Sequence, residues 1–385
     1  MSKEPKRESL NNLQNIFHRI LERYLQTSDK YYLNFIQDEL PRYLSIRNRE
    51  FSFYSKPVFK ANPRNKSQLI IDLYNDLNEI KIQILAELNL KVFTLNIKRF
   101  NYIYFKSSGW QYQVIHFLQK ESSKRLNQFI TSFLIHGSFA TGDFLKDWSD
   151  LDTKIILNDF VFQSSRHLDY AAKWFRKLSL LCDKIDPLSH HRFSFLTNFD
   201  LSYYPAFFLP KEVYNYALLL NGQPEIKINL RPDKDEIKKQ MIKFVGYFKD
   251  KVLDKKYSRN QGQFKNDLAR LMLWPSLMLQ TKDIYIYKKY SFKKAKQEFP
   301  QVDFSLVDEA GAIREQWSGS NLLRYYPDSL FTLLPFRFNQ IIINQYKRYL
   351  NGRPLPKTRK EIEIFTREAY YFLKKTFNLI KNEQK

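Results

Sequence analysis

The spacing of hydrophobic residues predicts helices over most of the first ninety positions. Apolar side chains between residues 13 and 25 recur at the i, i+3, i+4 spacing that places them on one face of a helix. A second run over residues 73–85 predicts another helix, which ends near Asn89. Between the two runs, Pro57 and Pro63 interrupt regular structure and indicate a loop.

The pattern then alternates between helices and strands. Residues 110–129 are typical of an amphipathic helix, and the apolar run over 130–136 predicts a strand directly after it. A second strand is expected to carry a pair of acidic residues into the apolar run 154–157. A helix over 167–183 and a strand over 190–196 follow. Such alternation argues for an α/β core.

A strand end at residues 218–222 precedes a stretch that is helical to the last residues. The expected helices cover residues 235–253, 260–281, 290–298, 303–317, 331–351 and 360–380. These patterns divide the chain into a mainly helical, basic N-terminal region (1–110), a core (111–230) and an all-helical, basic C-terminal domain (231–385).

The segment between the first two core strands carries the candidate chemistry. Gly137 and Ser138 follow the first strand, and Asp150 and Asp152 precede the second apolar run. Because strand side chains alternate between faces, the two aspartates project to one side, roughly 7 Å apart at the backbone. Carboxylates at this spacing can converge on divalent cations, and oxygen ligands suit Mg²⁺. Gly137 lets the backbone approach a phosphate, and Ser138 lies where a helix begins, a natural anion site.

This arrangement resembles the nucleotidyltransferase superfamily, which includes DNA polymerase beta, CCA-adding enzymes, kanamycin-type antibiotic nucleotidyltransferases and cyclic-dinucleotide synthases. Its signature is hydrophobic-Gly-Ser, a gap and Asp-x-Asp, here Ile135-His136-Gly137-Ser138 and Asp150-Leu151-Asp152. The resemblance implies an α/β (α+β) nucleotidyltransferase core with helical flanks, a nucleoside triphosphate bound over Gly-Ser, and Mg²⁺ (or Mn²⁺) held by the two aspartates. On the same basis Ser149 is a candidate to orient the first carboxylate, or to form a turn. Lys265 is a candidate to neutralise the phosphates.

One part of the family pattern is missing. The family usually has a third carboxylate on a later core strand, where it acts as general base, but the expected strand 190–196 contains no acid. Asp186 lies just before that strand and Asp200 just after it, and either is an alternative. His191 is a further candidate for base or third ligand, because a neutral imidazole serves both roles.

The composition is that of a folded protein. Hydrophobic residues make up 43% and aromatic residues 16% of the chain, which argues against disorder. The single cysteine, Cys182, excludes an internal disulfide and fits a reducing compartment. The chain lacks a run of about 18 apolar residues and an apolar secretory segment near its start, so neither a membrane span nor export is expected. A cytoplasmic location, without a membrane partner, is the expectation.

The formal net charge of +23 is unevenly distributed. Residues 1–130 hold 21 basic and 12 acidic side chains (+9), residues 131–230 hold 10 and 11 (−1), and residues 231–385 hold 32 and 17 (+15). Two positive flanks around a neutral core favour a polyanionic partner. A general lysine bias is the alternative, but it does not explain the neutral middle. The basic, aromatic segment 285–294 suits base stacking and phosphate pairing, or the covering of a helix junction.

The resulting hypothesis is a metal-dependent, template-independent nucleotidyltransferase that transfers NMP from an NTP to an acceptor hydroxyl, with RNA as acceptor. The helical C-terminal half motivates an alternative, a small-molecule nucleotidyltransferase of the antibiotic-modifying kind. The missing third acid motivates another, a catalytically inactive nucleotidyltransferase-like module that binds nucleic acid or a protein. A protein-modifying toxin is a fourth. The sequence does not specify the base, the acceptor or the oligomeric state.

Overall fold

The computed structural model describes residues 3–27, 29–51, 65–85, 90–105, 109–189, 192–205, 210–231, 234–317 and 321–383. Within these ranges, every helix is too short or too polar to pass through a lipid bilayer. Short 3-10 helices connect the main elements. They are η1 (Tyr102–Phe105), η2 (Asn127–Phe129), η3 (Asp159–Gln163), η4 (Lys211–Tyr216) and η5 (Leu322–Tyr325).

A mixed sheet forms the centre of the first part of the molecule. Its described strands follow the order β2 (Lys98–Arg99), β7 (Leu218–Gly222), β3 (Ile130–Ile135), β4 (Thr153–Leu157) and β5 (Phe195–Leu196). β3 pairs antiparallel with β4 and β7, whereas β5 runs parallel to β4. β3 and β4 are almost entirely buried, which explains why both read as continuous apolar runs.

A smaller sheet covers one face of this central sheet. It has the order β1 (Lys91–Asn96), β8 (Glu225–Arg231) and β6 (Tyr204–Pro205) among the described strands. Ile226 and Ile228 of β8 share a buried cluster with Leu134 and Leu219 of the central sheet. The two sheets therefore pack through apolar side chains.

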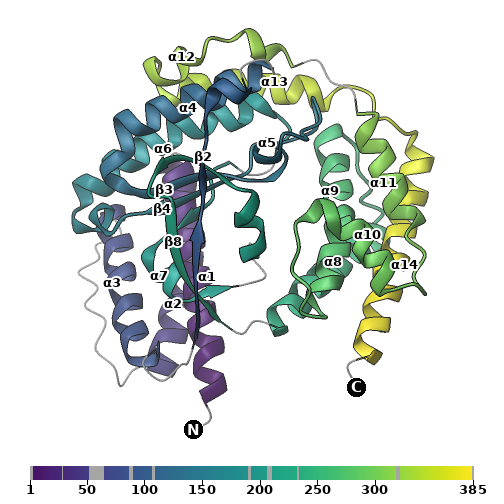
Figure 1. The fold of residues 1–385 in the computed structure, drawn as a ribbon, viewed down its shortest axis with the longest axis horizontal. Helices are drawn as coiled ribbons and strands as arrows, with labels where there is room; N and C mark the ends of the chain where they lie inside the picture. Colours follow the sequence, from purple (N-terminus) through teal and green to yellow (C-terminus); the bar gives the residue numbers. More distant parts are fainter. Residues whose placement is uncertain are drawn as a thin grey trace.

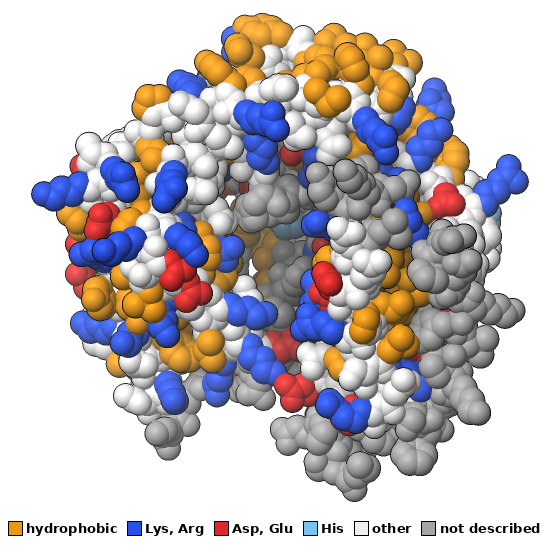
Figure 2. Space-filling model, turned by 180° about the vertical axis from the view of Figure 1, so that it is seen from behind, with side chains coloured by type: hydrophobic (Ala, Val, Ile, Leu, Met, Phe, Trp, Pro, Cys, Tyr) orange, Lys and Arg blue, Asp and Glu red, His pale blue; other side chains and the backbone are white. Residues whose placement is uncertain are grey.

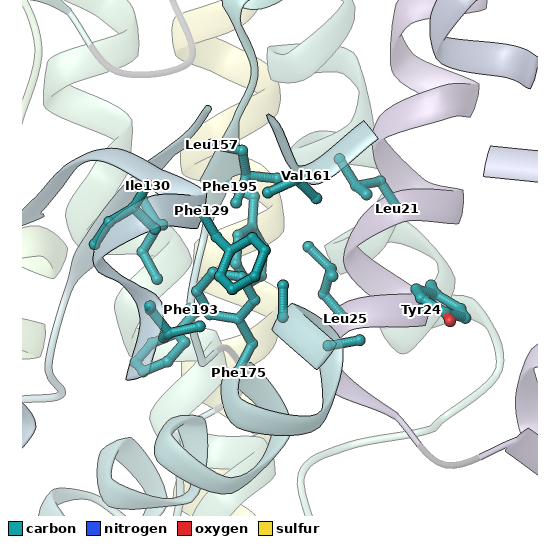
Figure 3. Packing of buried hydrophobic residues seen from close by; sticks show 14 of the residues in the cluster. Leu21, Tyr24, Leu25, Phe129, Ile130, Leu157, Val161, Phe175, Phe193 and Phe195 are labelled. Carbon is teal, nitrogen blue, oxygen red and sulfur yellow. The ribbon is translucent and has the colours of Figure 1, made fainter. Parts of the chain in front are cut away.

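Helices cover the other face. α4 (Trp110–Leu126) and α6 (Ser165–Ile185) pack together there, and α6 begins where the Ser164 hydroxyl accepts the His167 N–H. α1 (Lys3–Gln26) and α3 (Lys66–Leu85) pack on α6, and α2 (Asp29–Phe51) packs on α1. Figure 3 shows side chains from α1, α6 and β5 meeting in one core, among them Leu25, Phe175 and Phe195. The N-terminal helices thus share the core of the sheet.

Most C-terminal helices form a second core around the buried Trp274. They are α8 (Lys234–Leu253), α9 (Gln261–Gln280), α10 (Lys288–Glu298), α11 (Ser305–Glu315) and α14 (Arg359–Glu383). α12 (Asp328–Leu333) and α13 (Phe336–Asn351) instead return to pack on α6. In Figure 1 they lie across the top, with the sheets on one side and α8–α11 and α14 on the other. The surface is hollowed between these two parts (Figure 2).

The expected α/β centre with helical flanks is present. The helices expected over 110–129, 167–183, 235–253, 260–281 and 360–380 correspond to α4, α6, α8, α9 and α14. The division of the chain at residues 110 and 230 stays a prediction.

Several details of the prediction were wrong. The single helix expected over 331–351 is α12 and α13, because Pro335 cannot continue a helix. The strand expected over 190–196 is described only as β5, the two residues Phe195–Leu196. The second core strand begins at Thr153, so the aspartates precede it. β1 and β8 were not predicted.

Candidate active site

Gly137 opens a short helix, α5 (Gly137–Thr141), directly after β3 and lies against Asp152. Its φ is +69°, and a Cβ there would lie 2.3 Å from Asp152 Oδ2. The His136 N–H donates to the Asp152 carbonyl oxygen over 3.0 Å, which ties the start of α5 to the strand that follows the acidic pair. Only glycine combines this positive φ with so close an approach to a carboxylate.

Asp150 and Asp152 lie on one side of the chain just before β4. Between them Leu151 is 1% exposed in the main core, whereas both aspartates are partly exposed. Ser189 Oγ donates to Asp150 Oδ2 over 3.3 Å. The alternation that the sequence predicted therefore holds through this segment, although hydrogen bonding assigns the strand only from Thr153.

The two serines of the predicted site lie on either side of the turn that connects α5 to the acidic pair. Ser138 is half-buried in the first turn of α5, and its carbonyl oxygen accepts the N–H groups of Gly142 and Asp143. Ser149 is 8% exposed, and its hydroxyl accepts the Leu145 N–H over 2.9 Å. This contact fits the turn role of Ser149; nucleotide binding by either serine stays a prediction.

Asp200, one alternative for the third carboxylate, is fully buried in a separate hydrogen-bond network. It forms a capping box with Thr197 at the start of α7 (Asn198–Ser202), accepts a hydrogen bond from Gln14 and pairs with His18 over 2.7 Å. Burial would raise the pKa of Asp200, but His18, Thr197 and Gln14 together hold it at about 2. With both oxygens engaged in this way, Asp200 is disfavoured as a catalytic base.

Asp186, the second alternative, is buried beside the site but forms an ion pair. Lys265 Nζ lies 2.5 Å from one of its oxygens, and the Leu188 N–H donates to the other over 3.1 Å. Burial raises the pKa of Asp186, Lys265 opposes this, and the charge of Asp150 adds to the rise. His191, the remaining candidate, lies outside the described residues.

Lys265, the predicted phosphate ligand, therefore lies in an interior contact. Besides its ion pair with Asp186, its ammonium group is 5.2 Å from the centre of the Trp148 ring. The side chain links α9 to the segment that follows α6 and to the turn before the acidic pair. Its role toward phosphate stays a prediction.

Lys154, two residues after Asp152, is buried in β4. Its Nζ donates to Ser194 Oγ over 2.7 Å, next to the parallel pairing of β4 and β5. Burial lowers the pKa of Lys154 to about 8, against the opposing charges of Glu22, Asp200 and Asp152. Ser194, just before β5, therefore places a hydroxyl group beside Lys154.

Residues from the C-terminal helices face the acidic pair, and sequence reasoning did not select them. The Tyr287 hydroxyl lies 3.3 Å from Thr141 Oγ1 at the end of α5, and Lys289 pairs with Asp143 over 2.8 Å. These contacts dock the start of α10 on the segment after Gly-Ser. Between them lies Lys288, which is half-buried.

Lys288 interacts electrostatically with both aspartates and with Arg314 of α11. Burial lowers the pKa of Lys288, and Arg314 lowers it further, while Asp152 and Asp150 act in the opposite direction. Tyr287 and Lys288 fall within the basic, aromatic segment 285–294, so a signal for them was available. Arg314 carried no local signal, because only the packing of α11 on α9 brings it to the site.

The donor set suits a hard divalent cation, since it offers two carboxylates on one side of the chain. Within the described part of the chain, however, no three His, Cys, Asp or Glu residues are grouped closely enough to hold a metal. Among the described residues, backbone carbonyls, and beyond them water or substrate, are the sources of further ligands, while the candidate third ligand His191 lies outside that part of the chain.

Comparison with known proteins agrees with this geometry. Residues 118–256 match the family model described as a nucleotidyltransferase domain, a range that includes Gly137, Ser138, Asp150 and Asp152. No curated protein and no solved structure matches the chain. The match over residues 118–256 confirms the resemblance to the nucleotidyltransferase superfamily for the part of the chain that carries the Gly-Ser turn and the acidic pair.

Proposed function

We propose that the protein is a template-independent nucleotidyltransferase that transfers NMP from a nucleoside triphosphate to a hydroxyl group of RNA. The observation that carries this proposal is the contact between Gly137 and Asp152, which leaves no room for a side chain between the Gly-Ser turn and the acidic pair. Lys288, whose charge interacts with both carboxylates, and Arg314, whose charge interacts with Lys288, support it.

In this proposal the triphosphate lies between the Gly-Ser turn and the start of α10. Ser138 and neighbouring backbone N–H groups contact the phosphates from one side, and Lys288 and Arg314 neutralise them from the other. Tyr287 holds the two sides together through its contact with Thr141. Lys265 contributes indirectly, because its ion pair with Asp186 fixes the segment that carries Ser189.

Asp150 and Asp152 would hold the divalent cation, Mg²⁺ or Mn²⁺, which when bound lowers the pKa of an acceptor hydroxyl and offsets charge on the phosphates. Ser189 orients Asp150 through its 3.3 Å hydrogen bond. The acceptor oxygen attacks the α-phosphorus, the bond from that phosphorus to the bridging oxygen breaks, and pyrophosphate leaves as the hydroxyl proton is lost. His191 is the proposed base for this proton, because Asp186, like Asp200, has both carboxylate oxygens engaged.

RNA is the proposed acceptor because of the charge distribution. The core is neutral, at −1 over residues 131–230, whereas the flanks carry +9 and +15. A polyanion gains affinity from such flanks, while a small neutral acceptor gains little.

The test is transfer of label from each α-labelled nucleoside triphosphate to total RNA in the presence of Mg²⁺ or Mn²⁺. We expect the double variant Asp150→Asn/Asp152→Asn to lose at least about 10³-fold in rate with its fold retained, because electrostatic stabilisation supplies much of the acceleration. Asp254→Asn removes a half-exposed carboxylate outside the site and serves as the matched control. Equal rates for the wild type and the double variant would contradict the proposal.

A second candidate is a catalytically inactive module that binds nucleic acid. It is favoured because, among the described residues, no third His, Cys, Asp or Glu is grouped with Asp150 and Asp152 closely enough to hold a metal. RNA binding without label transfer, for every nucleotide and both cations, would select this alternative.

A further inference from the structure

The segment from η5 to α13 exposes an unusual number of large apolar side chains. The exposed fractions lie between 52% and 73%, so more than half of each side chain is open to solvent, for Leu322, Tyr325, Leu333, Phe338 and Ile341. Hydrophobic side chains gather over the top of the space-filling view in Figure 2, where Figure 1 places α12 and α13. A surface of this kind on a soluble fold marks an interaction site.

α13 presents a mixed stripe rather than a purely apolar one. Its inner face, with Asn339, Ile343 and Leu350, is buried. The exposed residues of the helix, called the α13 stripe, are Arg337, Phe338, Ile341, Asn344, Gln345, Arg348 and Tyr349. Phe338 is 52% and Tyr349 54% exposed; Tyr349 also stacks on Tyr346, with ring centroids 5.9 Å apart, and both rings keep exposed surface for a further stacking partner. The stripe thus combines two guanidinium groups, two rings and two amides.

The sequence that includes the α13 stripe is basic. The chain has seven basic residues and no acidic residue between Asp328 and Glu361. A second copy of this surface would be repelled by it. A partner that fits must be anionic and must offer flat apolar groups to the rings.

The C-terminal end of α13 is connected to the acidic pair. Lys347 Nζ donates to the Ser189 carbonyl oxygen over 3.1 Å, and Ser189 Oγ donates to Asp150 Oδ2 over 3.3 Å. Asn351 accepts the Gly262 N–H at the start of α9 over 3.0 Å. Lys347 and Asn351 therefore connect the C-terminal end of α13, which carries Arg348 and Tyr349 of the stripe, to the segment that holds Ser189 against Asp150 and to the start of α9.

We propose that the α13 stripe binds the single-stranded RNA acceptor and guides its 3′ end toward Asp150. This inference rests on the proposed function and names the surface that recognises its acceptor. Arg337 and Arg348 contact phosphates, and bases stack on Phe338 and Tyr349. An anionic membrane fits less well, because Asn344 and Gln345 interrupt the apolar residues and would have to leave water without partners.

The experiment measures binding of a fluorescent single-stranded RNA of about 20 nucleotides, long enough for the site sizes of such surfaces. Fluorescence anisotropy is recorded between about 50 and 200 mM salt for the wild type and two double variants. Arg337→Glu/Arg348→Glu removes the phosphate contacts, and Phe338→Ala/Tyr349→Ala removes the stacking rings. All four positions are exposed, so thermal unfolding should be close to that of the wild type.

The charge-reversed variant should bind at least about 10-fold more weakly, and the slope of log K against log salt should shrink by about 1.4, since each single-strand phosphate contributes about 0.7. The Ala variant should bind about 5- to 30-fold more weakly with an unchanged slope, because stacking is not ionic.

Matched controls on α14 are Lys374→Glu/Lys375→Glu, with the same change in net charge, and Tyr371→Ala, whose side chain is 62% exposed in the wild type. These controls should stay within about threefold of the wild type, as surface changes outside a contact do.

Wild-type RNA affinity in both α13 variants would overturn the inference. So would loss of binding to vesicles containing phosphatidylserine while RNA affinity is unchanged, which would assign the stripe to a membrane. The readout is independent of turnover. If the wild type transfers NMP but all variants bind RNA equally well, only the role of the α13 stripe is refuted. If RNA binds through α13 but no NMP is transferred, only the proposed reaction is refuted.

Discussion

At the scale of single residues, the site depends on one glycine. Gly137 lies in the left-handed region at φ +69°, with Asp152 in the space that a side chain would take. The motif in the sequence indicated a close approach to phosphate, and the structure adds a carboxylate as the immediate neighbour. Gly137 thus sets the distance between the turn and the acidic pair.

Gly137→Ala should abolish most activity. The new Cβ must displace Asp152, and a misplaced catalytic group commonly costs about 100-fold in rate. The left-handed backbone adds a destabilisation of about 1–2 kcal/mol. Transfer rate and thermal unfolding are the measurements. Gly246→Ala in α8 is the control, because its new Cβ meets no described atom within 4 Å; full activity in Gly137→Ala would refute the role given to this glycine.

Lys154 should make the free energy of unfolding depend on pH, and a single substitution can isolate this contribution. Because its pKa falls to about 8 on folding, the unfolded chain holds more protons between about pH 8 and 10.5, and stability should rise with pH in that window. Lys154→Met removes this contribution. The free energy of unfolding of the wild type minus that of the variant should increase by up to about 3 kcal/mol from pH 8 to 10.5. A constant difference would show that Lys154 is not held in a strained, desolvated state.

At the scale of elements, the site is assembled where α5, the end of α6, α9 and α10 meet. The buried ion pair between Lys265 of α9 and Asp186 after α6 is the clearest of these junctions, at 2.5 Å. The start of α10 makes another, through Tyr287 and Lys289. The acidic pair is therefore positioned by elements far apart in sequence.

Lys265→Met should destabilise the fold by about 3–5 kcal/mol, because it leaves a buried carboxylate without its partner. Asp186→Asn/Lys265→Met, which removes both charges, should lose less than Lys265→Met alone. Chemical denaturation of the three proteins gives both values. If Asp186→Asn/Lys265→Met were less stable than Lys265→Met, the unpaired, buried charge of Asp186 would not be what destabilises the single variant.

Lys288→Met should raise the KM for the nucleoside triphosphate at least about 10-fold, since a charge-assisted contact with phosphate contributes roughly 1.5–3 kcal/mol. Lys293→Met, an exposed position on the same helix, is the control. Steady-state kinetics with varied nucleotide measures the effect. An unchanged KM in Lys288→Met would place the triphosphate elsewhere.

The sequence predicted the long helices because their apolar spacing is regular, and it predicted β3 and β4 because buried strands are continuous apolar runs. It missed β1, four of whose six residues are exposed, and β8, although Ile226 and Ile228 alternate there with polar residues. The Gly-Ser turn and acidic pair could be found because they are local. Arg314 and the engagement of Lys265 with Asp186 could not, because both depend on how distant helices pack.

At the scale of the whole molecule, two parts with separate cores meet at the acidic pair. The sheets and N-terminal helices form one core and α8–α11 with α14 the other, while α12 and α13 cross between them (Figure 1). Both flanking segments are positive and the centre is neutral. This arrangement suits an enzyme that holds a triphosphate on one side of its carboxylates and a polyanionic acceptor on the other.

The most direct test of a cation site at Asp150 and Asp152 is a crystal grown with Mn²⁺ and a non-hydrolysable nucleoside triphosphate, measured by anomalous scattering. We expect an anomalous peak in direct contact with Asp150 and Asp152, with the triphosphate over Gly137 and Ser138 and facing Lys288. A nucleotide bound elsewhere, with Asp150 and Asp152 bearing no cation, would contradict it.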